Sequence, residues 1–124
     1  MANLEDLSPS ARALYDSLVS SGLLSPGAIT SGYRSPSHNA SVGGASRSQH
    51  THGNAIDIST KGWDDAQRQS LLDAAIAAGA KGVGVYPGGS IHLDVRETPA
   101  VWGPGGSYRA PRLKDGTVDV SAFP

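Results

Sequence analysis

The sequence of 124 residues contains no cysteine. This absence excludes disulfide bonds, thiol nucleophiles, iron–sulfur clusters and every cysteine-ligated zinc finger. A metal site in this chain must therefore be built from His, Asp or Glu side chains. The chain has four histidines, few enough for each to be considered separately.

Net charge and long hydrophobic runs are lacking as well. Ten Lys and Arg residues nearly balance eleven Asp and Glu residues, which leaves a formal net charge of -1. This balance provides neither a basic surface for nucleic acid nor a polybasic patch for a membrane. No apolar run approaches the roughly 20 residues that span a bilayer, and the first residues lack the features of a signal peptide. We therefore expect no nucleic-acid partner, no membrane insertion and synthesis in the cytoplasm.

The length corresponds to one compact domain, and 16 Gly and 8 Pro residues indicate many loops. Apolar residues recur at helical spacing between Ser8, a suitable N-cap, and Gly22, and again over residues 63–78. Ser35 is a suitable cap for a shorter helix that ends before Gly43. Strands are predicted at 29–34, 54–59, 83–86 and 90–96, with a weak indication at 118–120.

Two of these predicted strands carry ionisable residues on one face. Ile56 and Ile58 alternate with Asp57, and His92 and Asp94 alternate with apolar residues of the 90–96 strand. If the two strands are neighbours in one sheet, their polar faces coincide. His50, from the loop before the first strand, can then converge on one point with Asp57 and His92.

Two imidazoles and one carboxylate leave a fourth coordination position open, which is typical of a catalytic zinc site. Zinc there would have a water of lowered pKa and could polarise a peptide carbonyl. Two histidines and an aspartate occur in many chains, so this pattern alone does not decide the chemistry.

The exact sequence motifs are more specific than this set of three residues. Residues 48–57 match the pattern Ser-x-His-x-x-Gly-x-Ala-x-Asp, and residues 31–44, 82–87 and 91–96 add further motifs in order. This combination resembles the family of zinc D-Ala-D-Ala carboxypeptidases, D-Ala-D-Ala dipeptidases and phage L-alanyl-D-glutamate endopeptidases. The resemblance runs from about residue 30 to 96. It implies a small α+β domain of the hedgehog and DD-peptidase type, an antiparallel sheet with flanking helices, and the mixed order of predicted elements is consistent with this.

The resemblance also implies roles for individual residues. Carried over by position, His50, Asp57 and His92 are the three ligands of one zinc ion. Arg34 corresponds to an arginine that holds a substrate carboxylate or carbonyl, for which a guanidinium fork is well suited. Ser48 matches a serine at the edge of the site that can orient a ligand or a substrate amide.

One position departs from the pattern. Many relatives have Glu or Asp three residues before the last ligand as the general base, and this chain has Gly89 there. Asp94 is the nearest carboxylate that can substitute as a catalytic proton shuttle. It can equally hold His92 or Arg96 in place, and both roles stay open. A subgroup of the family shares the His-x-Asp form, so the missing acid does not imply an inactive enzyme.

Three further residues have alternative interpretations. The motif spacing favours His50 over His52 as the ligand, which leaves His52 lining the cleft or solvated. His38 is expected at the surface or at a helix cap. Tyr86 either borders the cleft or packs at the end of its strand.

The function implied is zinc-dependent hydrolysis of peptide bonds in the stem peptide or cross-bridge of bacterial peptidoglycan, by endopeptidase or carboxypeptidase action. The start of the sequence fits a phage or prophage endolysin that a holin releases to the cell wall, or a tail-associated hydrolase. Residues 1–103 would form the peptidase domain, and residues 104–124 a Gly/Pro-rich extension that docks on tail or baseplate proteins. The alternative is a non-catalytic zinc module of the same fold, resembling hedgehog signalling domains.

Overall fold

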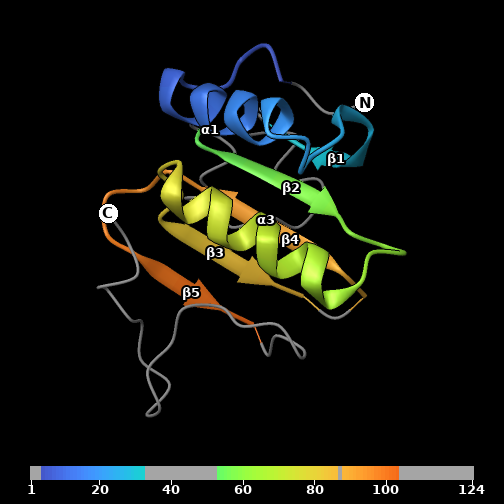
Figure 1. The fold of residues 1–124 in the computed structure, drawn as a ribbon. Coiled ribbons are helices and arrows are strands. Elements are labelled where there is room, and N and C mark those ends of the chain that lie inside the picture. Colours follow the sequence, from blue (N-terminus) through green and yellow to red (C-terminus); the bar gives the residue numbers. More distant parts are fainter. Residues whose placement is uncertain (1–3, 33–52, 87, 104–124) are drawn as a thin grey trace, which may run out of the picture.

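The computed structural model describes residues 4–32, 53–86 and 88–103. The described elements form one sheet and two helices, shown in Figure 1. In chain order they are α1 (Pro9–Ser20), a 3-10 turn (Pro26–Ala28), β1 (Ile29–Ser31), β2 (Ala55–Ser59), α3 (Asp65–Ala77), β3 (Gly82–Val85), β4 (Ser90–Asp94) and β5 (Ala100–Trp102). The predicted helix after Ser35, the predicted strand at 118–120 and the extension 104–124 lie outside the described residues.

Both described helices begin at the caps that their sequences provide. The Ser8 hydroxyl accepts a hydrogen bond from the Ala11 N–H, and proline occupies the first turn of α1. Helix α3 begins with a capping box, in which Asp64 and Gln67 each accept the other's backbone N–H, at 2.7 and 2.9 Å. Among residues 4–32, 53–86 and 88–103, no helix is long and apolar enough to cross a membrane.

The five strands form a single sheet in the order β1-β2-β4-β3-β5. The pairs β1–β2, β2–β4 and β4–β3 are antiparallel, as predicted, and each of these four strands ends within three residues of its predicted limits. Strand β5 was not predicted, because the chain after Glu97 is rich in Gly and Pro. It pairs in parallel with β3 and adds a short edge to the sheet.

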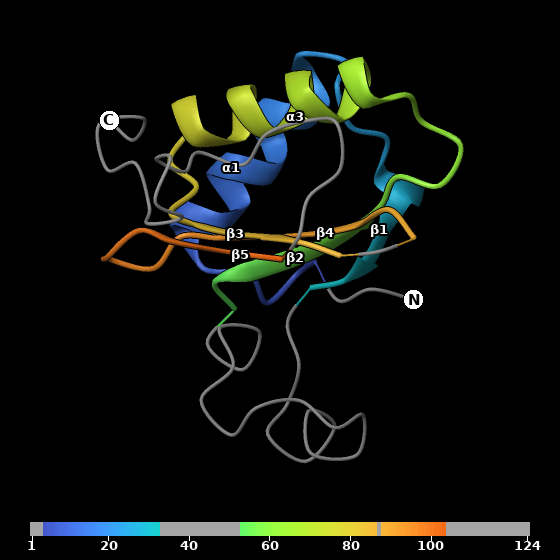
Figure 2. The same cartoon turned by 90° about the horizontal axis from the view of Figure 1, so that it is seen from below.

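Figure 2 shows that α1 and α3 cover the same face of the sheet. That face is filled by aliphatic residues that alternate along three strands and are almost completely buried: Ile56, Ile58, Val83, Val85, Ile91 and Leu93. Leucines from both helices pack against them. The predicted α+β class, a small domain with helices against a sheet, is thus confirmed, and the opposite face of the sheet is left for polar side chains.

Candidate metal centre

The face of the sheet away from the helices carries a row of residues that are cross-strand partners. His92 on β4 lies between Asp57 on β2 and Gly84 on β3, its two cross-strand partners. Gly84 is in turn paired with Trp102 on β5. The two predicted polar strands are therefore neighbours, as a shared site requires. The row joins an acid and an imidazole that are 35 positions apart in the chain.

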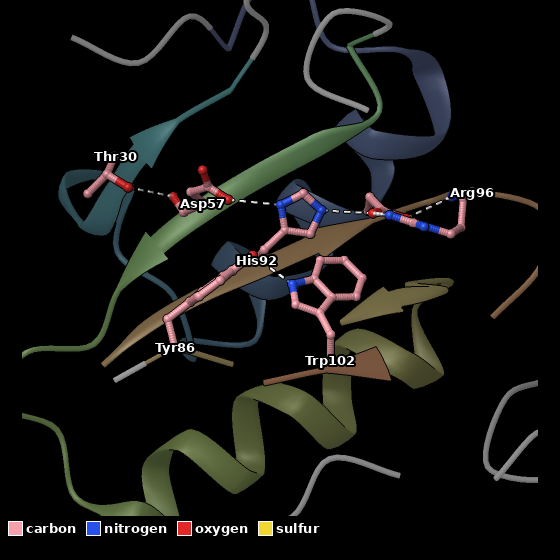
Figure 3. Close-up of polar contacts among 7 residues, drawn as sticks. Thr30, Asp57, Tyr86, His92, Arg96 and Trp102 are labelled. Atoms are coloured by element: carbon pink, nitrogen blue, oxygen red, sulfur yellow. Dashed lines mark hydrogen bonds and ion pairs between the residues drawn. The ribbon is translucent and has the colours of Figure 1, made fainter. Parts of the chain in front are cut away.

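The His92 ring lies between two carboxylates, as Figure 3 shows for its contact with Asp57. Its Nδ1 is 3.0 Å from Oδ1 of Asp57, and its Nε2 is 2.7 Å from Oδ2 of Asp94. Burial lowers the pKa of His92, but its hydrogen bonds to Asp57 and Asp94 and their negative charges outweigh burial and raise that pKa. Both ring nitrogens thus have a carboxylate partner, which fixes the direction of the imidazole.

Asp94 is fully buried and held mainly by Arg96. The guanidinium donates to both carboxylate oxygens, at 2.8 Å from Nε and 2.6 Å from Nη2, and the backbone N–H of Arg96 donates at 3.1 Å. Burial raises the pKa of Asp94, yet these hydrogen bonds and the one with His92 lower it well below its usual range. A carboxylate bound in this way accepts a further proton poorly, so its contacts favour the holding role over the proton shuttle.

Two glycines of β3 make room for this arrangement. Gly82 is opposite Asp94, and a Cβ atom on Gly82 would overlap the Asp94 carboxylate. A Cβ atom on Gly84 would overlap the indole of Trp102. Because strand residues alternate between faces, the two glycines lie on the face of the site, while the valines between and after them fill the core.

Trp102 forms one wall of the site, a role that its sequence pattern did not indicate. Its ring centroid is 5.1 Å from that of His92, and the Arg96 guanidinium carbon is 5.1 Å from the indole centroid. The Trp102 Nε1–H donates to the Tyr86 hydroxyl at 2.6 Å, visible in Figure 3. Tyr86 is 43% exposed and borders the site, one of its two predicted placements. The alternating glycines at 82 and 84 were the sequence signal that space is kept for a large side chain.

The edge beyond Asp57 is closed by the neighbouring strand β1. The Thr30 hydroxyl donates to the backbone carbonyl of Asp57 at 3.3 Å. Before β2, Gly53 has a positive φ of 70°, and its carbonyl accepts the Ser8 N–H at 2.8 Å. A Cβ atom on Gly53 would overlap the Asp6 carbonyl, so glycine is required where the chain enters β2.

Gly89, the position where the family pattern led us to expect an acid, lies in the turn between β3 and β4. Its φ is +94°, a conformation that favours glycine. Its carbonyl accepts the backbone N–H of Thr60 at 3.0 Å and the Thr60 hydroxyl at 2.5 Å, and Arg68 in turn donates to that hydroxyl at 2.8 Å. The turn is thus anchored to the segment before α3, and an acidic side chain at this position would strain the backbone.

Of the predicted zinc ligands, Asp57 and His92 are described, and His50 lies outside the described residues, as do Arg34 and Ser48. Within residues 4–32, 53–86 and 88–103, no group of three His, Asp or Glu side chains is arranged to hold a metal ion. The described pair nevertheless fits one. Two ligand atoms on a tetrahedral zinc ion lie about 3.4 Å apart, close to the 3.0 Å between Nδ1 of His92 and Oδ1 of Asp57. The carboxylate on Nε2 is the usual partner of a metal-binding histidine.

Comparison with known proteins adds an independent finding. A family model described as peptidase M15 matches residues 10–94, well over half of the chain. The matched segment begins in α1 and ends at Asp94, so it includes Asp57 and His92 but not β5. No curated protein matches the chain significantly.

Proposed function

The chain belongs to the peptidase M15 family, and we propose that it is a zinc-dependent peptidase that cleaves peptide bonds in bacterial peptidoglycan. The observation that carries this proposal is the pairing of Asp57 with His92 on the open face of the sheet. An acid and an imidazole face each other there, and a second carboxylate holds the far side of the imidazole. A histidine held between two carboxylates supports a metal centre on this face of the sheet.

His50, Asp57 and His92 would hold the zinc ion. When bound, zinc supplies a Lewis acid that polarises the scissile carbonyl and lowers the pKa of water. Asp57 provides a negative charge that offsets that of the cation. His92 directs Nδ1 towards Asp57, because Nε2 is held by Asp94.

Asp94 and Arg96 would act behind the ligands. The Asp94 carboxylate accepts from Nε2 of His92, which strengthens the imidazole as a ligand. Arg96 neutralises that buried carboxylate through two hydrogen bonds.

An Asp94→Asn variant distinguishes the role of Asp94 in holding His92 from a role in proton transfer. A holding role predicts zinc affinity about 10- to 100-fold weaker, with activity restored at saturating zinc. A proton-shuttle role predicts unchanged zinc affinity and lost activity.

The substrate and setting extend the proposal. Arg34 would bind a carboxylate or carbonyl of the peptide, and Ser48 would orient a ligand or a substrate amide. The chain would act on the cell wall as a phage or prophage endolysin or as part of a virion tail, with residues 104–124 docking on tail or baseplate proteins. Deletion of 104–124 should then abolish tail assembly and leave hydrolysis intact.

The direct test is digestion of purified peptidoglycan. New amino termini should appear with the wild-type protein, disappear when a chelator is added and return with zinc. Mass analysis of the fragments identifies the bond and separates endopeptidase from carboxypeptidase action. Release that persists unchanged in the chelator would refute a zinc mechanism.

A non-catalytic zinc module is the second candidate, and the turn at Gly89 favours it. The left-handed conformation there disfavours the acid that the resemblance implies for many relatives at this position. In that case the protein binds zinc tightly but releases no amino termini from any peptidoglycan type. The same digestion, accompanied by a measurement of zinc content, distinguishes the two functions.

A further inference from the structure

The edge strand β5 places a large aromatic ring on the face of the proposed metal centre. Trp102 pairs with Gly84, and Gly84 pairs with His92 on its other side. Because Gly84 has no side chain, the indole occupies the space above β3 and reaches the His92 ring two strands away. Residue 102 lies beyond the segment 10–94 that the family model matches, so the match assigns it no role.

The indole contacts the face of the His92 ring, whereas the two carboxylates contact its nitrogens. Asp57 and Asp94 contact the ring nitrogens and thereby fix the ring within its own plane. Hydrogen bonds tolerate considerable tilt of that plane. The Trp102 ring, 5.1 Å from His92 between centroids and inclined by 48°, limits that tilt by contact.

Trp102 is itself fixed from two directions. Its Nε1–H donates to the Tyr86 hydroxyl, and the Arg96 guanidinium lies over its ring. Arg96 also holds Asp94, so the same cation contacts both the indole and the carboxylate that is hydrogen-bonded to His92. The indole is therefore a rigid neighbour and not a side chain that merely fills space.

From these contacts we propose that Trp102 is a positioning residue that sets the plane of the His92 ring and, through it, the affinity of the metal centre. This inference rests on the proposed function, because it treats His92 as a zinc ligand. The indole acts through His92 and does not itself bind the substrate. Tyr86 supports it by accepting the indole N–H.

The test compares zinc dissociation constants, measured by competition with a chromophoric chelator. Trp102→Leu should weaken zinc binding about 10-fold or more, the lower range for partners of metal ligands. Trp102→Phe retains an aromatic face and should preserve most of the affinity. Tyr86→Phe removes the acceptor of the indole N–H. Its zinc affinity should lie between that of Trp102→Phe and that of the wild type. At saturating zinc, kcat and KM of Trp102→Leu on peptidoglycan fragments should return close to wild-type values.

Trp63 provides a matched control, because it packs against the core, in the segment before α3. Trp63→Leu should lower thermal stability and leave zinc affinity unchanged. With Trp63→Phe, the emission of Trp102 should change when zinc is added, whereas with Trp102→Phe the emission of Trp63 should not.

Equal zinc affinity in the wild type and a folded Trp102→Leu variant overturns this inference and leaves the proposed function intact. A raised KM at unchanged zinc affinity also overturns it, since the indole would then contact the substrate. Failure of the wild-type protein to bind zinc overturns both proposals. If Trp102→Leu does not fold, two other variants decide. Zinc affinity of Tyr86→Phe equal to that of the wild type, together with Trp102 emission in Trp63→Phe that does not change on zinc addition, would refute the inference.

Discussion

The two faces of the sheet use the same strands for opposite purposes. On the face towards the helices, β3 presents two valines and β4 presents Ile91 and Leu93, all almost completely buried. On the other face, the same strands present two glycines, an imidazole and a carboxylate. The period-2 alternation of a strand allows this division. One face is filled to stabilise the domain, and the other keeps space for a charged network.

The two ends of β4 make a second contrast, because each is held by an arginine. At the hairpin end, Arg68 donates to the hydroxyl and carbonyl of Thr60, which anchor the turn. At the other end, Arg96 donates to the carboxylate of Asp94. The first arginine also pairs with Asp65 at 3.1 Å, on the half-exposed start of α3, and supports the fold. The second keeps a buried carboxylate ionised beside a proposed metal ligand.

The largest effect on the polar face is expected from His92→Ala. This change removes the proposed ligand and the shared partner of Asp57 and Asp94. Hydrolysis of peptidoglycan and zinc binding should both be lost, while circular dichroism shows a folded protein. Metal analysis and digestion measure the outcome, and full zinc occupancy in the variant would contradict it.

Leu93, the residue after His92, tests the comparison of the two faces from the face that packs against the helices. Leu93→Ala opens a cavity in the filled core and should lower the free energy of unfolding by about 2–5 kcal/mol. Urea denaturation measures this loss. Well below the melting temperature, the folded fraction should bind zinc as the wild type does. A loss of zinc affinity as large as that of His92→Ala would show that the two faces are not independent.

Gly82→Ala tests whether the space on the polar face is needed. The added methyl group overlaps the carboxylate of Asp94, and crowding of this kind costs about 1–3 kcal/mol. Zinc affinity should also fall, because displacement of Asp94 releases His92. Gly27→Ala is the control, since a Cβ atom there meets only the Ser25 hydroxyl at 4.0 Å. Equal stability of the two variants would refute the need for space.

The smallest effect is a pH dependence of the metal-free protein. The pKa of His92 is raised above 6.5 in the folded state, so its protonation stabilises the fold fully below that value. This contribution is lost as the pH rises through the raised pKa. In chelator, the wild type should therefore be less stable at pH 9 than at pH 6. His92→Gln should remove this difference in urea denaturation, and a wild type that is more stable at pH 9 would contradict the sign.

Much of the fold was predictable because local chemistry specifies it. Ser8 caps α1 as predicted, and the alternation around Asp57 and His92 assigned their faces correctly. The helix predicted over 63–78 begins two residues later, at Asp65, because Asp64 is its N-cap. Strand β5 was not predictable, since three residues among glycines and prolines carry too little pattern. Its pairing with β3 depends on where β3 lies.

The sequence by itself determined the residue types of the site, the faces on which they lie and, through the motifs, the family. Only the tertiary structure decided which groups meet: Asp57 with His92, Asp94 with Arg96, and Trp102 above Gly84. The physical reason is that alternation along a strand is local, whereas the register between strands is set by packing of the whole sheet. The space above Gly84 could not be interpreted from the sequence, because only the folded sheet places the Trp102 indole there.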